Sequence, residues 1–200
     1  MAQIQTKAIA DRIYPAEGFA ADAVRIVCAT ILMALCAHIV IPLPWTPVPV
    51  TGQNFGVLLV ALLLGARRGA LALGLYLLEG AAGLPVFQPL GVPGIARFAG
   101  PTAGYLISYP FAAWITGWIS ERWASVGNAV RRTSGLLAAV VTGEVVMLGA
   151  GCAWLATGMG LGWQRAIAVG ATPFLGVEAI KVAVLFALAG SFEFLRRREQ

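Results

Sequence analysis

The sequence contains few charged residues and few of the side chains that catalysis usually needs. Only 12% of its 200 residues are charged, and His38 is the only histidine, whereas water-soluble domains carry about 25% charged residues. A lone histidine leaves no basis for HExxH metal chemistry or a histidine-based catalytic pair. Cys28, Cys36 and Cys152 lie in apolar segments without CxxC spacing, which favours small buried side chains over a disulfide framework or a metal site. We therefore expect no metal and no other cofactor.

Hydrophobic residues are what the sequence has in abundance. They make up 59% of the chain, and the mean hydropathy is +0.82. Repeated apolar stretches of near-spanning length, broken by short polar or Gly/Pro-rich connections, are typical of a polytopic helical protein, because lipid cannot satisfy free backbone groups. We predict an all-α bundle of about six transmembrane helices, with spans at 23–42, 53–66, 69–84, 102–120, 134–156 and 173–195.

The basic residues predict the orientation of this bundle. An even number of spans puts both termini on one side, and only Arg97 and Arg165 face the other side. Because Lys and Arg collect in cytoplasmic loops, we expect a protein of the plasma (inner) membrane with both termini cytoplasmic. The basic residues on the side of the termini are Lys7, Arg12, Arg25, Arg67, Arg68, Arg122, Arg131, Arg132, Arg196, Arg197 and Arg198. The formal net charge of +5 at pH 7 is therefore better explained by membrane orientation than by nucleic-acid binding.

Three parts of the chain follow from the same pattern. Residues 1–22 lack the apolar core and cleavage site of a signal peptide, so they are predicted to be a cytoplasmic N-terminal segment before an uncleaved first span. Residues 23–195 form the transmembrane domain, and residues 196–200 form a basic cytoplasmic tail.

An ionisable pair lies inside the last predicted span. Lys181 has Glu178 one helical turn before it, in the otherwise apolar stretch 173–195. A charged residue at bilayer depth costs about 3 kcal/mol even on lenient scales and usually faces a cavity, a partner or a substrate. At i, i+3 spacing the two side chains share one helix face. We interpret the pair as the floor of a ligand site, and a purely structural salt bridge is the alternative.

Two other acids, Glu79 and Glu144, lie within predicted spans. Three interpretations of Glu144 remain open: a polar contact with a neighbouring helix, a protonated carboxyl group, and a proton-coupling group. The sequence assigns no role to Glu79.

Two outer connections are rich in proline and apolar residues. Prolines stiffen the first, 42–49, because each fixes its own backbone angle and biases the preceding residue toward extended geometry. The second, 83–101, is too long for a minimal turn and too apolar for a solvated linker, which is typical of lids and binding loops. We expect both to close as flaps over one pocket, although an interfacial tryptophan anchor is the simpler role for the first. The residues expected to gate the pocket are Trp45, Pro47, Pro49, Leu84, Pro85 and Phe87.

Several short motifs, taken in order, resemble the BioY family. They are PVPVTGQ at 47–53, Gly65, GLPVF at 83–87, GPTAGYL at 100–106, and a Pro-Phe step before the acidic-x-x-Lys unit. The match covers about residues 29–189. The chain departs from the family pattern with Glu178 in place of Asp, Ala103 in place of a Gly, and Glu79 where an apolar residue is usual.

BioY proteins are the biotin-binding S components of energy-coupling-factor transporters. The resemblance therefore implies a six-helix subunit, not an enzyme, that captures biotin from the outer face and delivers it inward. Three alternatives stay open: an S component for another small vitamin, an intramembrane lipid-modifying enzyme, and a ligand-free structural subunit.

The chemistry of biotin fits the ionisable pair. A ureido ring offers two N–H donors and one C=O acceptor, so Glu178 can accept from an N–H while Lys181 donates to the C=O. Alternatively, Lys181 pairs with the valerate carboxylate. The resemblance also places Gln53, Tyr76 and Tyr105 near the outer half of the bundle, as secondary ligand contacts or as interhelical hydrogen bonds. Arg97 either attracts an anionic vitamin at the mouth or faces lipid headgroups.

Partner chains are implied as well. S components resemble one another in a stripe of small residues on the first helix that docks the transmembrane coupling subunit, and Thr30 with Ala34 is the better candidate here. Packing within the bundle is an equal alternative. The sequence has no phosphate-binding loop, so ATP hydrolysis would belong to separate ATP-binding subunits. A homo-oligomer is also possible.

Overall fold

The computed structural model describes the backbone of residues 18–124 and 128–198, and the side chains of these residues except Ala129 and residues 187–198. Within these ranges the chain is an all-α bundle, as predicted, with one pair of two-residue strands. In chain order the elements are α2 (Phe19–His38), β1 (Val40–Ile41), β2 (Val50–Thr51), α3 (Gln53–Ala81), the 3-10 helix η1 (Gly94–Ala99), α4 (Ala103–Ala124), α5 (Ala129–Ala153), the π-helical turn η2 (Trp154–Gly158), α6 (Trp163–Gly170) and α7 (Leu175–Arg198). Most of the predicted N-terminal segment 1–22 lies outside the described residues.

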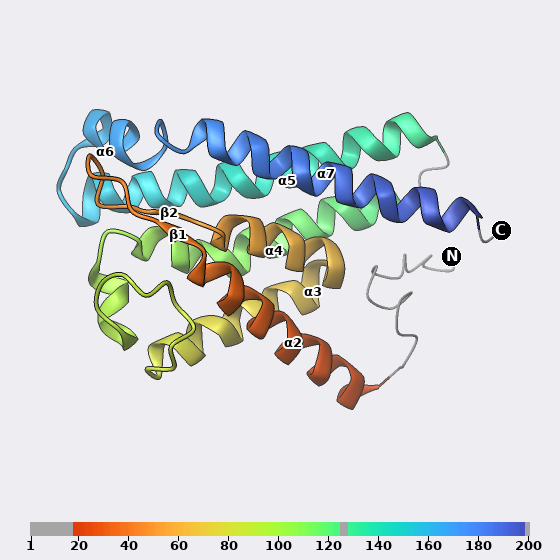
Figure 1. Cartoon of the computed structure of the whole chain (residues 1–200), viewed down its shortest axis with the longest axis horizontal. Coiled ribbons are helices and arrows are strands. Elements are labelled where there is room, and N and C mark those ends of the chain that lie inside the picture. The colour runs from red at the N-terminus through yellow and green to blue at the C-terminus, as the bar shows by residue number, and fades with distance from the viewer. Residues whose placement is uncertain (1–17, 125–127, 199–200) are drawn as a thin grey trace.

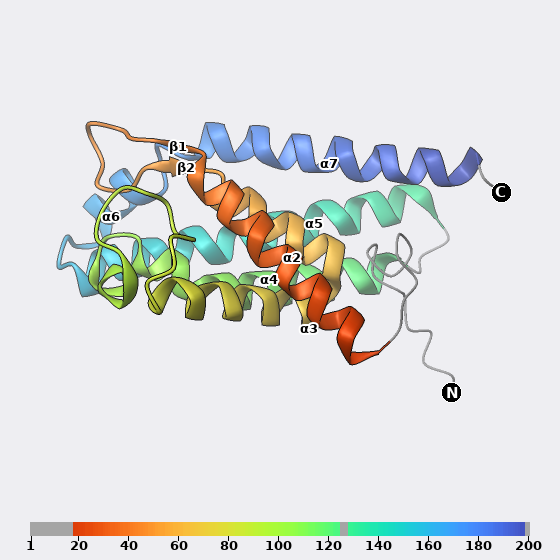
Figure 2. The ribbon, with the colours of Figure 1, turned by 60° about the horizontal axis from the view of Figure 1, so that its bottom comes forward.

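The long helices pack around α4. This helix lies between α3 and α5, and α2 packs on α3. Figures 1 and 2 show that α4, α5 and α7 run lengthwise while α2 crosses the bundle obliquely. The strand pair, α6 and the loop that carries η1 gather at one end of the molecule, whereas the start of α2 and the end of α7 point toward the other end.

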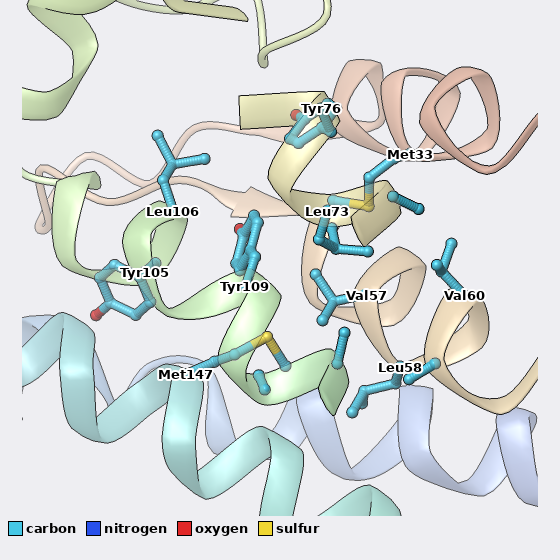
Figure 3. Packing of buried hydrophobic residues seen from close by; sticks show 14 of the residues in the cluster. Met33, Val57, Leu58, Val60, Leu73, Tyr76, Tyr105, Leu106, Tyr109 and Met147 are labelled. Atoms are coloured by element: carbon cyan, nitrogen blue, oxygen red, sulfur yellow. The ribbon is translucent and has the colours of Figure 1, made fainter. Parts of the chain in front are cut away.

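The core lies where α2, α3, α4 and α5 meet. Met33 of α2, Leu58, Leu73 and Tyr76 of α3, and Met147 of α5 are fully buried there. Figure 3 shows these side chains converging with Leu106 and Tyr109 of α4. Large apolar side chains also cover the outside of the bundle, including the outward face of α2. Such an outer surface suits contact with lipid chains, which are as apolar as leucine.

Helix α3 breaks at Gly65. This glycine has φ 77° and ψ −174°, a left-handed backbone that other residues adopt only with strain. The N–H of Ala66 then donates to the Glu121 carboxylate over 2.9 Å, which satisfies a backbone donor at the start of the second limb. The predicted spans 53–66 and 69–84 are thus the two limbs of α3. The break comes earlier than expected, since Arg67 and Arg68 are helical rather than part of a connecting loop.

The first predicted span, 23–42, is wrong at its C-terminal end. Helix α2 stops at His38, and the next residues form β1, which pairs antiparallel with β2 through Val40 with Thr51 and Ile41 with Val50. Pro42 explains the difference, because proline disfavours the helical conformation in the residue before it. The first outer connection is therefore a short hairpin, 40–51, and not a simple turn.

The connection between the fifth and sixth predicted spans contains helical structure that the sequence analysis did not predict. It contains the end of η2 and the eight-residue helix α6. Helix α7 begins at Leu175, close to the predicted start of the sixth span at residue 173, and it continues to Arg198. The backbone of residues 196–198, within the predicted basic tail, is therefore helical.

Several helices could cross a membrane by length and composition alone. These are α2, α3 and the segment Val130–Gly158, and a fourth span results if Trp163–Gly170 and Leu175–Phe186, bent by 50°, are taken together. The break in α3 divides it into two limbs. The described helical limbs that correspond to the predicted spans are α2, the two limbs of α3, α4, α5 and α7.

Candidate functional site

The ionisable pair on α7 is formed and nearly enclosed. Lys181 Nζ donates to Glu178 Oε1 over 2.7 Å, and the Lys181 and Glu178 side chains are 14% and 8% exposed. The same ammonium group donates to the main-chain oxygen of Thr51 over 2.7 Å. Lys181 thus joins the charge pair to β2, on the outer hairpin.

The start of α7 explains why the carboxylate lies there. The N–H of Glu178 donates to the Phe174 oxygen over 2.8 Å, so Glu178 stands in the first turn of the helix. A negative charge is favoured at this end by the helix dipole. Lys181, three residues later, then comes out on the same face.

A small cavity of about 30 Å³ lies beside Glu178. Its walls come from the hairpin, α3, α4, α5 and the start of α7: Val48, Pro49, Thr51, Gln53, Asn54, Thr102, Tyr105, Tyr109, Leu148, Phe174 and Glu178. The structure therefore brings together the predicted ligand residues Glu178, Gln53 and Tyr105. Lys181 stands behind Glu178, while Tyr76 and Arg97 lie elsewhere.

Gln53 and Tyr76 bind each other. Gln53 Nε2 donates to the Tyr76 hydroxyl over 2.9 Å, and that hydroxyl donates to the Val86 oxygen over 3.0 Å. Tyr76 is fully buried, and its ring meets Phe87 edge-on at 5.4 Å between centroids. In this structure the two predicted contacts form an interhelical link that also holds the second outer loop.

Tyr105 joins α4 to α6. Its hydroxyl donates to the Gly170 oxygen over 2.5 Å, and its ring lies so close to α5 that a side chain at Gly151 would meet it at 2.0 Å. The hairpin is also bound to α6, because Thr46 Oγ1 donates to the Val169 oxygen over 2.6 Å.

Arg97 is buried inside the second outer loop. Its guanidinium donates to the Gln88 oxygen over 2.7 Å and also to the Leu90 oxygen. Burial lowers the pKa of Arg97, and the nearby Tyr76 partly counters this effect. In this structure the guanidinium group holds its own loop together. The two predicted roles, attraction of the vitamin and contact with headgroups, stay predictions.

Both outer loops border a second pocket of about 200 Å³. The hairpin contributes Pro47 and Pro49, and the second loop contributes Arg97. The other predicted gating residues differ in environment. Trp45, Leu84 and Pro85 are exposed, whereas Phe87 is buried against Gly80, Tyr76 and Phe98.

The predicted docking residue Thr30 points into the bundle. It is 3% exposed, and its hydroxyl contacts Glu79 Oε1 at 3.2 Å. This contact favours packing within the bundle, one of the two alternatives for Thr30, and gives Glu79 a partner. Ala34 is half-buried, and the outward face of α2 carries Ile31 and Leu35.

The sequence interpretation missed Asn54. Its Nδ2 donates to Glu144 Oε1 over 2.9 Å, linking α3 to α5 beside the cavity. An amide in an otherwise apolar span was the available signal, because such groups seek a partner across helices. Glu144 Oε2 and Glu178 Oε2 are enclosed and have no hydrogen-bond partner among the described residues. The described part of the chain holds no group of three or more His, Cys, Asp or Glu side chains able to hold a metal ion.

Comparison with known proteins gives consistent results. The BioY family model matches residues 5–198. The biotin transporter BioY of Rhizobium etli is 44% identical over 164 residues, which cover 81% of this chain and 86% of that protein. The biotin transporter BioY of Thermotoga maritima is 35% identical over 80% of this chain and 88% of its own.

A solved structure shares the fold. The crystal structure of the S-component for biotin from an ECF-type ABC transporter matches with a TM-score of 0.73 and 23% identity, over 92% of this chain and 96% of that one.

Proposed function

Because this chain belongs to the BioY family, we propose that it is a multi-pass membrane protein that captures biotin at the outer face of the plasma membrane and delivers it inward as an S component. The names of the relatives describe biotin transporters. They support biotin over another vitamin, and transport over lipid modification or a purely structural role.

The observation that carries this proposal is the enclosed Glu178–Lys181 pair beside the cavity. Each charge is compensated by the other, and Lys181 is also bound to the Thr51 oxygen, so neither charge is buried unpaired when the ligand is absent. Glu178 Oε2 still has no partner among the described residues. This oxygen can accept from a ureido N–H, and Lys181 can turn a donor toward the ureido oxygen or the valerate carboxylate.

Binding requires the outer loops to move. A cavity of about 30 Å³ holds little more than water, whereas small-molecule sites usually have volumes of about 300–1,000 Å³. The hairpin closes the cavity with Val48 and Pro49. We expect the hairpin and the loop 83–101 to swing outward, admit biotin and close over it again, with Trp45, Pro47, Pro49, Leu84, Pro85 and Phe87 as gating residues.

The remaining ligand contacts follow from this movement. Gln53 and Tyr105 line the cavity, and their hydrogen bonds to Tyr76 and Gly170 hold the Gln53 amide and the Tyr105 hydroxyl at the cavity walls. Arg97 lies at the outer pocket, where it would face the anionic end of the vitamin once the loops part.

The proposal extends to orientation and partners. The start of α2 and the end of α7 lie away from the loop-bearing end, and together with the distribution of basic residues this supports cytoplasmic termini. A coupling subunit and ATP-binding subunits would supply the energy, and α2 with Ala34 offers a membrane-exposed face for docking.

Calorimetry on the detergent-purified chain tests the vitamin claim. We expect tight binding of biotin and none of thiamine or riboflavin. Lys181→Ala should abolish biotin binding, whereas Arg165→Ala, at an exposed position on α6, should bind normally. A folded wild-type chain that does not bind biotin would refute the proposal. Normal binding by Lys181→Ala would remove the pair from the site.

A further inference from the structure

The contact between Asn54 and Glu144 lies at the edge of the cavity, and the proposed biotin site has not yet used it. Asn54 lines the cavity, whereas Glu144 stands behind it on α5. Both residues are nearly enclosed, at 8% and 7% exposure. In the described part of the chain, Nδ2 to Oε1 is the hydrogen bond that joins them.

This hydrogen bond decides which end of the amide is offered to a ligand. An asparagine side chain carries a donor end and an acceptor end of nearly equal shape, and a carboxylate oxygen can only accept. Glu144 therefore holds the NH₂ group of Asn54 on its own side. The carbonyl oxygen Oδ1 is left as the polar atom that Asn54 presents to the cavity.

A glutamate at position 144 has a free-energy cost that packing between helices does not explain. An acid in the middle of a transmembrane helix is unfavourable without compensation, and one of its oxygens is enclosed with no partner among the described residues. Asn54 supplies a single hydrogen bond to the other oxygen. An apolar side chain would fill the same space at lower cost, which favours a role in the neighbouring site.

We infer that Asn54 Oδ1 accepts a hydrogen bond from one ureido N–H of the ligand, and that Glu144 is the positioning residue that keeps this oxygen turned toward the cavity. The inference rests on the proposed function, since it names a group of the same ligand. It adds a specificity-determining residue on α3 to the charge pair on α7.

The pattern of polar groups then matches a cyclic urea. Glu178 and Asn54 both line the cavity, and they come from α7 and α3. Each offers an acceptor oxygen, and Lys181 offers a donor. A ureido ring presents the complementary set of two N–H donors and one C=O acceptor. A ligand lacking either donor leaves one enclosed oxygen unpaired, which is the strongest basis for discrimination in a buried site.

A double-mutant cycle tests the positioning role, with biotin affinity as the readout. Asn54→Ala and Glu144→Leu, which removes the acceptor for the Asn54 NH₂ group, should each weaken binding about tenfold or more, the loss expected for one hydrogen bond in an enclosed site. The double variant should be no weaker than Asn54→Ala, because Glu144 acts through Asn54. Glu79→Leu, the same change in an acid that contacts Thr30 instead, is the matched control and should bind like wild type.

Ligand analogues keep the test independent of folding. In the two cyclic carbamate analogues of biotin, oxygen replaces one or the other ureido N–H without added bulk. Against the wild-type chain, both should bind more weakly than biotin. For one of them, the difference between wild type and Asn54→Ala should disappear, which a merely structural role of Asn54 would not produce.

The outcomes separate the two proposals. If Lys181→Ala loses biotin while Asn54→Ala and Glu144→Leu bind like wild type, the biotin site stands and this inference fails. Losses that simply add in the double variant, or carbamates that bind as well as biotin, also overturn it. If the folded wild type does not bind biotin, both proposals fail.

Discussion

The ammonium group of Lys181 lies 2.7 Å from the main-chain oxygen of Thr51. The residue at the floor of the site therefore also holds the hairpin that covers it. These two residues are far apart in the sequence. Because of their contact, closure of the hairpin should change when a ligand binds the Lys181 ammonium group.

Removing this contact should loosen the hairpin. We expect Lys181→Ala to raise amide hydrogen exchange at least about tenfold in residues 40–51, because a hydrogen bond to a charged group stabilises by about 1.5–3 kcal/mol. Exchange in α4, which Lys181 does not hold, serves as the internal control. Unchanged exchange in the hairpin of a folded variant would contradict this role.

Close packing at the break in α3 should make Gly117 intolerant of a side chain. A Cβ atom there would lie 2.4 Å from the Ala66 nitrogen, a backbone atom that cannot move aside easily. We expect Gly117→Ala to destabilise the protein by about 1–3 kcal/mol, measured by thermal unfolding in detergent.

Gly74→Ala is the matched control for this change. Gly74 is also helical, but nothing lies within 4 Å of a Cβ atom built there. Alanine is favoured over glycine inside a helix by about 1 kcal/mol, so this variant should be as stable as wild type or more so. Equal effects of the two substitutions would argue against the close approach.

Arg97 should control how firmly the second loop is held. It donates to the oxygens of Gln88 and Leu90, and a lysine lacks the rigid fork needed to reach two acceptors in this way. We predict that Arg97→Lys releases biotin several-fold faster, measured by chase of labelled biotin. Arg165→Lys, at an exposed position on α6, should release it at the wild-type rate.

Biotin methyl ester separates this holding role from direct contact with the ligand. If Arg97 acts only on its loop, the ratio of release rates between wild type and Arg97→Lys should be the same for the ester as for biotin. A ratio that falls toward one with the ester would show instead that Arg97 pairs with the carboxylate.

The predicted orientation can be measured by cysteine labelling. Trp45 and Arg67 are both exposed, and they lie in the outer hairpin and at the break in α3. In a background with Cys28, Cys36 and Cys152 replaced, a membrane-impermeant maleimide should label Trp45→Cys in intact cells but Arg67→Cys only after permeabilisation. The reverse pattern would place the termini outside.

Much of the architecture could be predicted because it depends on local patterns. Apolar length gives the helices, and the spacing of Glu178 and Lys181 gives their shared face. The hairpin at residues 40–51 and the helix α6 were missed, because their stability comes from contacts with distant residues. The hydrogen bond from Thr46 to Val169 is one such contact.

The site was predictable in the same uneven way. Glu178 stood out because a charge in an apolar span is costly. Asn54 did not, since a neutral amide gives a weaker signal and its partner Glu144 comes from another helix. The role of Thr30 was left open for a related reason. Spacing along α2 cannot say which side faces α3, where Glu79 contacts Thr30.

The last turn of α6 has a consequence for how the site opens. Thr46 of the hairpin and Tyr105 of α4 are bound to the adjacent oxygens of Val169 and Gly170. The roof and one wall of the cavity are therefore fastened to a single turn of helix. A displacement of that turn would break both hydrogen bonds together. The hairpin and the wall formed by α4 should therefore open in one concerted step rather than one after the other.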